Sequence, residues 1–176
     1  MDNAVLQNMR HRRSCRAFLP QQITLEEMET VIEAGAWAAS GMGRQPVVFV
    51  AVQDKATRDT LSALNAKWMG KEEGFDPFYG APTVVVVLVK ADIPTAVEDG
   101  SLAMGNMMNA AASIGLGSCW IHRARQIFDS EEGKALLAAW GIEQDYIGIG
   151  HCVLGYAAQP AGEGAPRKEG RLLEVL

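Results

Sequence analysis

The chain has 176 residues, 48% hydrophobic and 21% charged, and this composition is typical of a folded domain and excludes intrinsic disorder. Its 16 basic and 21 acidic residues leave a net charge of −5, which argues against a nucleic-acid-binding scaffold. The 3 cysteines are far apart and odd in number, so they indicate a reducing compartment rather than a disulfide framework (Cys15, Cys119 and Cys152). We therefore expect a single domain over residues 1–176.

No targeting or membrane segment is predicted. Residues 1–13 lack the apolar stretch of a signal peptide. The most apolar run, 83–89, is much shorter than the roughly 20 residues of a membrane helix, and its valines favour a buried strand. We expect a cytoplasmic protein with no membrane partner and no nucleic-acid partner.

The N-terminal half is expected to form a helix over 5–13, a helix from 25 to about 39, a strand over 47–52 and a helix from 55 to about 68. Thr24 and Glu27 have the spacing of a capping box, and Asp54 is placed to cap the third helix. Helical spacing predicts one buried face on the second helix (Leu25, Met28, Ile32 and Ala36). A glycine-rich break over 40–46 separates that helix from the strand.

The C-terminal half is expected to form a loop over 70–82, strands over 83–89, 118–121 and 148–156, a helix over 97–114 and a helix that ends near 140. The unbroken apolar run of the first strand indicates that both of its faces are covered. Asp129 and Glu132 suggest a second capping box. Gly100 and Gly105 indicate that a neighbour packs closely on the long helix. A flexible tail over 157–170 precedes an apolar end, 171–176, which we expect to dock on another surface.

The densest chemical signal is a basic cluster at residues 10–16. Its arginines lie beside the hydroxyl of Ser14, and guanidinium groups match the oxygens of a phosphate monoester. A solvated basic face is an equally good interpretation of this segment alone. Cys119 lies in a sequence similar to that around protease cysteines, but too little chain follows it for the partner residues. A zinc site on His122, His151 and the two later cysteines is disfavoured by their spacing, so no metal is expected.

Several segments in order resemble the flavin-dependent nitroreductase family. They are Arg12–Phe18, Ser40–Phe49, Phe78–Pro82, Asn109–Ile121 and Leu154–Tyr156 followed by Pro166–Lys168. The resemblance implies an α+β fold in which a mixed β-sheet is flanked by helices, in a single domain that forms an intertwined homodimer with FMN sites at the interface. The sequence departs from the family pattern at Gly43, where an asparagine is usual, and at Val47, where a tryptophan is usual. We expect cofactor binding to survive these departures, and the acceptor preference of the family does not carry over at these two positions.

The resemblance also implies roles for individual residues toward FMN. Arg12, Arg13 and Ser14 would hold the phosphate and ribityl chain, joined by Arg167 and Lys168 from the tail. Arg16 would lie near the N1–C2=O edge of the flavin and raise its reduction potential. Trp120, Ile121 and His122 would run past the ring, with the His122 N–H aimed at N5. Ser40, Gly41 and Gly43 would close the site from the partner chain.

The activity implied by the resemblance is that of an oxidoreductase. NADH or NADPH would deliver hydride to FMN, and the flavin would then reduce a nitroaromatic, a quinone or an enone by a ping-pong mechanism. No catalytic side chain is required, because the flavin carries the chemistry. The alternative is a flavin-binding or sensing protein of the same fold with little turnover.

Overall fold

The structure is a computed structural model that describes residues 1–143 and 145–175. At its centre is a four-stranded sheet in the order β1-β2-β4-β3. The strands are β1 (Val47–Val52), β2 (Thr83–Lys90), β3 (Gly117–Ile121) and β4 (Tyr146–Gly155). All three strand pairs are antiparallel. The parallel component expected of a mixed sheet is a single isolated bridge between Ser14 and Ser118, on the outer edge of β3.

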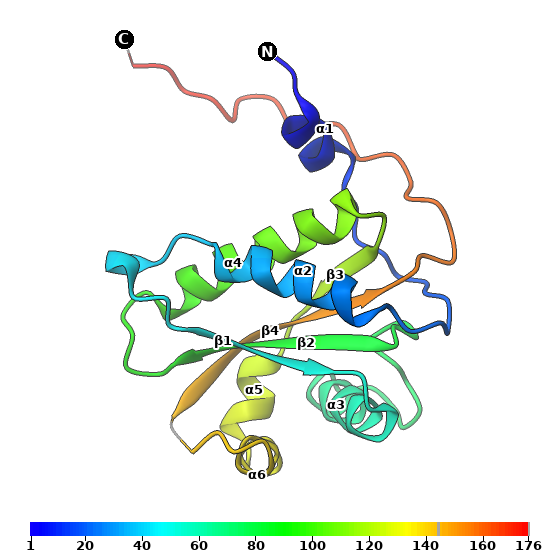
Figure 1. Ribbon diagram of the computed structural model, residues 1–176, viewed down its shortest axis with the longest axis vertical. Helices are drawn as coiled ribbons and strands as arrows, with labels where there is room; N and C mark the ends of the chain where they lie inside the picture. Colours follow the sequence, from blue (N-terminus) through cyan, green and yellow to red (C-terminus); the bar gives the residue numbers. More distant parts are fainter. Residues whose placement is uncertain (144, 176) are drawn as a thin grey trace.

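Helices cover both faces of this sheet (Figure 1). On one face lie α2 (Leu25–Ala36) and α4 (Ala96–Ser113), and on the other lie α3 (Lys55–Trp68), α5 (Ala124–Asp129) and α6 (Glu131–Ala139). The short α1 (Ala4–His11) stands beyond the C-terminal end of α4, beside the C-terminal tail (Figure 1). No helix within residues 1–143 and 145–175 is long and apolar enough to span a membrane.

Strand β2 is the centre of the hydrophobic core. Every residue from Thr83 to Val89 is buried, which confirms the prediction that both faces of this strand are covered. Val85, Val87 and Val89 belong to the cluster beneath α2 and α4, whereas Val84, Val86 and Leu88 belong to the cluster beneath α3, α5 and α6. The alternation follows from the two-residue period of a strand.

Helix α4 packs tightly on the sheet at only one of its two glycines. A Cβ atom at Gly100 would lie 2.5 Å from Cγ1 of Ile149, so this glycine permits the contact between α4 and β4. A Cβ at Gly105 would meet nothing within 4 Å. The prediction of a close neighbour is therefore confirmed at Gly100, whereas no described atom of the same chain packs closely at Gly105.

Helix α2 differs from its prediction in length and in its buried face. The capping box forms as expected, but the helix ends at Ala36 rather than Ala39, and a 3-10 turn, η1 (Gly41–Gly43), follows. Met28, Val31 and Gly35 are the buried positions, whereas Leu25 and Ala36 are exposed and Ile32 is half-buried. Gly35 fixes this rotation, because a Cβ there would lie 2.7 Å from Cγ of Met107 on α4.

The segment after β3 was predicted incompletely. It contains α5, which the sequence patterns do not indicate, and α6 is capped by Ser130 instead of Asp129. The Ser130 hydroxyl accepts from Gly133 N–H, while the Asp129 carboxylate pairs with Arg125 one turn earlier. Asp129 is thus already engaged on its own helix.

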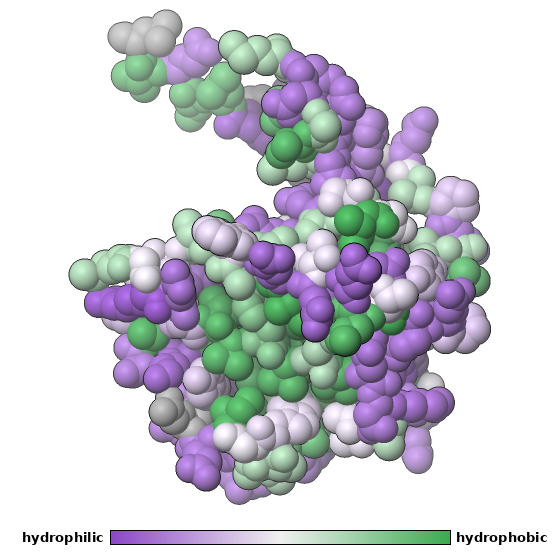
Figure 2. Space-filling model, viewed as in Figure 1, coloured by the Kyte–Doolittle hydropathy of each residue, from purple (hydrophilic) through white to green (hydrophobic). Residues whose placement is uncertain are grey.

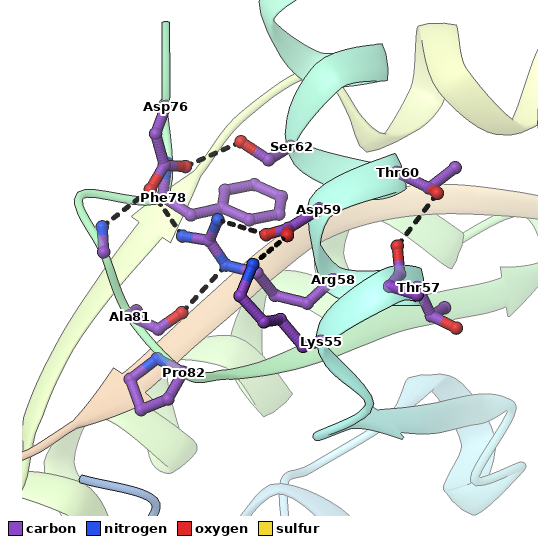
Figure 3. Close-up of polar contacts among 12 residues, drawn as sticks. Lys55, Thr57, Arg58, Asp59, Thr60, Ser62, Asp76, Phe78, Ala81 and Pro82 are labelled. Atoms are coloured by element: carbon purple, nitrogen blue, oxygen red, sulfur yellow. Dashed lines mark hydrogen bonds and ion pairs between the residues drawn. The ribbon is translucent and has the colours of Figure 1, made fainter. Parts of the chain in front are cut away.

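The loop 70–82 is held in place by the carboxylate of Asp76, shown in Figure 3. It accepts hydrogen bonds from Arg58 (2.5 Å), Ser62 (2.6 Å), Phe78 N–H (2.9 Å) and Gly80 N–H (2.7 Å). Partial burial raises the pKa of this carboxyl, but the donors outweigh the burial and hold the pKa below its ordinary value. These hydrogen bonds of the Asp76 carboxylate join α3 to the loop that leads into β2.

Candidate functional site

A cavity of about 650 Å³ lies where the N-terminal segment, the end of α4 and the C-terminal tail meet. Four of the predicted cofactor residues line it: Arg12, Arg13, Ser14 and Arg16. The opposite walls are Ala112 and 115–117 after α4, and residues 157–162 of the tail. No acidic residue is among those lining residues, although the chain as a whole carries a net charge of −5. The cavity is therefore suited to an anion.

The basic segment is fixed by pairing with the edge strand β3. Cys15 N–H donates to the Ser118 carbonyl over 2.9 Å, beside the parallel bridge formed by Ser14. Gly117 makes this approach possible, since a Cβ there would lie 2.9 Å from Sγ of Cys15. At the other end of the segment, Asn8 Nδ2 donates to the Asn109 carbonyl over 2.8 Å and ties α1 to α4.

The guanidinium groups differ in how they are satisfied. Nη1 of Arg12 is buried and has no hydrogen-bond partner within residues 1–143 and 145–175. Nη1 of Arg13 donates to the carbonyls of Arg10 (2.5 Å) and Arg12 (2.7 Å), although its Nε is buried and unpaired in the same described part of the chain. A buried charged donor without a partner is costly, and a bound phosphate would satisfy it. The residues present therefore fit the phosphate end of FMN.

The loop with Ser40, Gly41 and Gly43 lies away from this cavity, at the opposite end of α4. Gly41 N–H donates to the Asp99 carboxylate in the first turn of that helix. The cavity begins at Ala112 in the last turn, which is about 20 Å further along the helix axis. The loop cannot reach the cavity of its own chain.

Trp120, Ile121 and His122 lie toward the far end of β3. Gly117 lines the cavity, and Ile121 is about 13 Å further along the strand. Trp120 is half-buried, Ile121 is buried, and His122 is exposed, with its carbonyl held by Asn65 Nδ2 at 2.8 Å. None of the three lines the cavity, and the expected contact between the His122 N–H and the flavin stays a prediction.

Arg167 and Lys168 are exposed on the tail and are not among the residues that line the cavity. The tail contacts the basic segment earlier, at Gly164, whose Cα lies against the Arg13 guanidinium. Beyond it, Leu172, Leu173 and Val175 are at least 75% exposed. The described part of the apolar end, 171–175, therefore does not dock on its own chain, and Leu176 lies outside the described residues.

The two cysteines and the histidine within strands β3 and β4 are buried. Burial raises the pKa of the Cys119 thiol and raises the pKa of Cys152 to about 12, so both stay protonated at neutral pH. Burial lowers the pKa of His151 to about 4. No cluster of three or more potential metal ligands occurs in the part of the chain that the structure describes. These groups supply neither a thiolate nucleophile nor a metal centre.

A family model described as the Nitroreductase family matches residues 9–156. The chain belongs to the nitroreductase family. This membership confirms the resemblance drawn from the motifs, and solved structures confirm the fold. A nitroreductase with bound FMN from Bacteroides fragilis is 30% identical, covers 99% of this chain and 100% of its own, and has a TM-score of 0.91. A second from Desulfitobacterium hafniense, 23% identical and covering 100% of both chains, has the same fold with a TM-score of 0.89.

Relatives known by name are similar over most of the chain. A putative NADH dehydrogenase/NAD(P)H nitroreductase from Archaeoglobus fulgidus is 31% identical over 149 residues, which cover 82% of this chain and 80% of the relative. An FMN reductase [NAD(P)H] from Bacillus subtilis is 26% identical over 138 residues, which cover 70% of this chain and 55% of the relative.

Several residues that shape this nitroreductase site are not indicated by sequence patterns. Residues 157–162 form one wall of the cavity as an irregular tail, and no periodicity marks such a segment. Asn65 and Asp99 lie inside helices and are hydrogen-bonded to distant backbone atoms, each through a part-buried bond. A polar residue on the buried face of a predicted helix is the only signal that could have drawn attention to them.

Proposed function

We propose that this chain is an FMN-dependent oxidoreductase that uses NADH or NADPH to reduce a small acceptor. The observation that carries this proposal is a cavity with no acidic lining residue, one wall of which is Arg12, whose buried Nη1 has no hydrogen-bond partner among residues 1–143 and 145–175. The FMN-bound nitroreductase from Bacteroides fragilis supports it, at 30% identity over essentially the whole chain. When bound, FMN supplies the two-electron chemistry, taking hydride from NAD(P)H and passing electrons to the acceptor in a ping-pong sequence.

The residues of this chain bind and orient the cofactor. Arg12 and Ser14 would hold the phosphate and ribityl chain in the cavity, and Arg16, which lines the same cavity, would supply a cation to the flavin ring. A cation beside the ring stabilises negative charge on its reduced form. Ile121 and His122 at the end of β3 would face the part of the ring that extends out of the cavity, and Arg167 and Lys168 would add positive charge from the tail. No protein acid or base is assigned, because Cys119 and Cys152, the buried thiols of the sheet, stay protonated.

We also propose that the functional unit is a homodimer. The Ser40–Gly43 loop lies about 20 Å along α4 from the cavity of its own chain and cannot cover it. In the proposed dimer the loop covers the cavity of the other chain. Large exposed apolar residues on α2, α4 and the loop provide an interface (Leu25, Trp37, Met42, Val97 and Leu102). Apolar residues near the C-terminus lie at the end of an arm that projects from the body (Figure 2). In the dimer this C-terminal arm packs on the surface of the second copy.

The acceptor is a small, flat molecule such as a nitroaromatic, a quinone or an enone. The connection between β2 and α4 is only the five residues 91–95, so this chain places no helical lid there. Val47 lines a hollow of about 140 Å³ beneath the Ser40–Gly43 loop, in the place where a larger side chain would pack. The exposed Gly43 offers only backbone groups toward the partner's site. Both features enlarge the space available to an acceptor.

We place the protein in the cytoplasm as a single domain over residues 1–176. The three cysteines are free thiols, which fits a reducing compartment. The two hydrophobic clusters lie on opposite faces of one sheet, which fits one folding unit.

The test is a cofactor titration followed by steady-state kinetics. The purified protein should bind FMN more tightly than FAD, because the arginines of the cavity suit one terminal phosphate and no dinucleotide fingerprint is present. Varying NAD(P)H at several acceptor concentrations should give the parallel double-reciprocal lines of a ping-pong mechanism. Tight FMN binding without turnover would instead identify a flavin-binding or sensing protein, and absence of FMN binding would reject the proposal.

A further inference from the structure

Asp99 is a buried carboxylate whose two oxygens are both hydrogen-bonded, one of them to the Ser40–Arg44 loop. Its side chain lies in the first turn of α4 and is only 3% exposed. Oδ1 accepts from Gly41 N–H over 2.8 Å, and Oδ2 accepts from the Thr95 hydroxyl over 2.9 Å. A carboxyl group is costly to bury unless its oxygens are hydrogen-bonded, so these contacts offset the cost of keeping the Asp99 side chain inside. They join the Ser40–Arg44 loop to the start of α4.

The loop backbone is shaped to fit this anchor. A Cβ atom at Gly41 would lie 2.5 Å from Oγ1 of Thr95, so only glycine allows the close approach. Met42 has a φ of 56°, in the left-handed region that costs a non-glycine residue conformational energy. Such a conformation persists only where the surroundings enforce it. Asp99 and Thr95 supply that constraint from outside the loop.

Few side chains support the loop from below. The hollow of about 140 Å³ beneath it is lined mainly by small or apolar residues, together with Gln45 and Asp99 (Gly35, Ala36, Ala38, Ala39, Ser40, Val47 and Phe49). Empty space under a loop removes van der Waals contacts that would keep it in position. The position of the loop over the helix therefore depends on Gly41, whose N–H donates to Asp99 and whose backbone lies against the Thr95 side chain.

We propose that Asp99 is a positioning residue for the flavin site of a second copy of this chain. This inference rests on the proposed function, in which the Ser40–Gly43 loop closes the cavity of the partner subunit. Asp99 itself does not touch the cofactor. It holds Gly41 and, through it, the loop at the height that covers the flavin ring of the other chain.

The first test compares Asp99→Ala with Gly41→Ala in the FMN-loaded protein, with Gly105→Ala as the control on the same helix. Losing a hydrogen bond to a carboxylate changes an equilibrium constant by about tenfold or more. The KM for the electron-accepting substrate should therefore rise by about that factor in Asp99→Ala. Iodide should quench the bound flavin more effectively, while the Kd for FMN, which is set by the basic cavity, stays close to wild type. Gly41→Ala displaces the same loop with Asp99 intact and should give the same pattern. Gly105→Ala should leave all three quantities unchanged.

The two variants also keep the test valid if one fails to fold. If Asp99→Ala is insoluble, Gly41→Ala provides the loop displacement, and adding Thr95→Ala should restore iodide protection by removing the clashing hydroxyl. Wild-type iodide protection and KM in both single variants would overturn the proposal. An equal loss of FMN affinity and of acceptor affinity, with quenching unchanged, would show a general structural role and would also overturn it.

The second test asks which subunit's flavin Asp99 serves. Subunits carrying Arg12→Ala and Asp99→Ala (or Gly41→Ala) are co-expressed with different tags, and mixed dimers are isolated. At a low FMN concentration the flavin occupies only the subunit with an intact Arg12, and its covering loop then comes from the subunit with an intact Asp99. Iodide protection should therefore return to the wild-type value in the mixed dimer. Protection as poor as in the Asp99→Ala homodimer would overturn the inference, whereas a wild-type protein that binds no FMN or elutes as a monomer would reject the proposed function instead.

Discussion

Replacing Arg12 and Arg16 separately should divide the basic cavity into an anchor and a tuning residue. Nη1 of Arg12 is buried without a partner in the described chain, so a phosphate contact there replaces an unsatisfied charged donor. A charge-assisted hydrogen bond is worth about 1.5–3 kcal/mol, and Arg12→Ala should weaken FMN binding by about 10–100-fold. With the site saturated, the reduction potential of the flavin should barely move. Fluorescence titration of FMN measures the first quantity.

Arg16→Ala should show the opposite pattern. Arg16 is exposed on the wall of the same cavity. In the proposed complex a bound flavin would cover it, and its charge would stabilise the reduced ring more than the oxidised ring. A differential stabilisation of about 1–2 kcal/mol corresponds to a potential lower by roughly 20–40 mV for a two-electron couple. An anaerobic potentiometric titration in excess FMN measures this shift.

Arg13→Ala is the control for the loss of a nearby charge. Nη1 of Arg13 already donates to two carbonyls, so its removal should loosen the N-terminal segment and lower the unfolding midpoint more than it weakens FMN binding. If Arg12→Ala binds FMN as tightly as wild type, the phosphate has been placed in the wrong cavity. If the potential of Arg16→Ala is unchanged, Arg16 is only an anchor.

Three further predictions concern stability. His151 has a pKa of about 4 in the folded protein against an ordinary value of 6.5, so between these pH values the unfolded chain binds a proton that the folded chain does not. About 3 kcal/mol of the free energy of unfolding, fully present above pH 6.5, should therefore be lost as the pH falls to 4. Denaturant titrations of His151→Gln across this range should lack that loss. Gly100→Ala should cost about 1–3 kcal/mol because its Cβ would overlap Ile149, whereas Gly105→Ala should be neutral or stabilising by up to about 1 kcal/mol in thermal unfolding. Asp76→Ala removes the acceptor of four donors and should lower the free energy of unfolding in urea by about 2–3 kcal/mol. The control Asp59→Ala should lower it by less than about 1 kcal/mol, because the ion pairs of Asp59 are more exposed. Equal effects within either pair of variants would contradict the packing or hydrogen-bond argument.

Local signals predicted the elements that depend on local contacts. The Thr24–Glu27 capping box forms both of its reciprocal bonds, and Asp54 caps α3 through Thr57, because each motif lies within one turn of helix. The buried strand β2 follows from its uninterrupted valines. The start of α6 could not be placed to the residue, since Asp129 and Ser130 are both good capping residues and the ion pair with Arg125 decides between them.

Sequence patterns predicted the residues of the cavity only in the basic segment, where several arginines follow one another in the chain. Four of the predicted residues line the cavity because the basic segment is continuous and pairs with β3 as a unit. The loop at 40–43 and the residues 120–122 lie elsewhere in the chain, and only a second subunit and a bound cofactor would bring them together. The buried face of α2 was misplaced because its apolar residues form two overlapping stripes, and contact with Met107 on a distant helix selects one.

The most direct measurement is an anaerobic reaction of the FMN-loaded protein with NADH or NADPH, followed by the absorbance of the flavin. The proposed function predicts that one of the two nucleotides bleaches the flavin band without an acceptor present, and that adding a nitroaromatic or a quinone afterwards restores it. A protein that holds FMN tightly yet shows no bleaching with either nucleotide would contradict the assignment as an oxidoreductase.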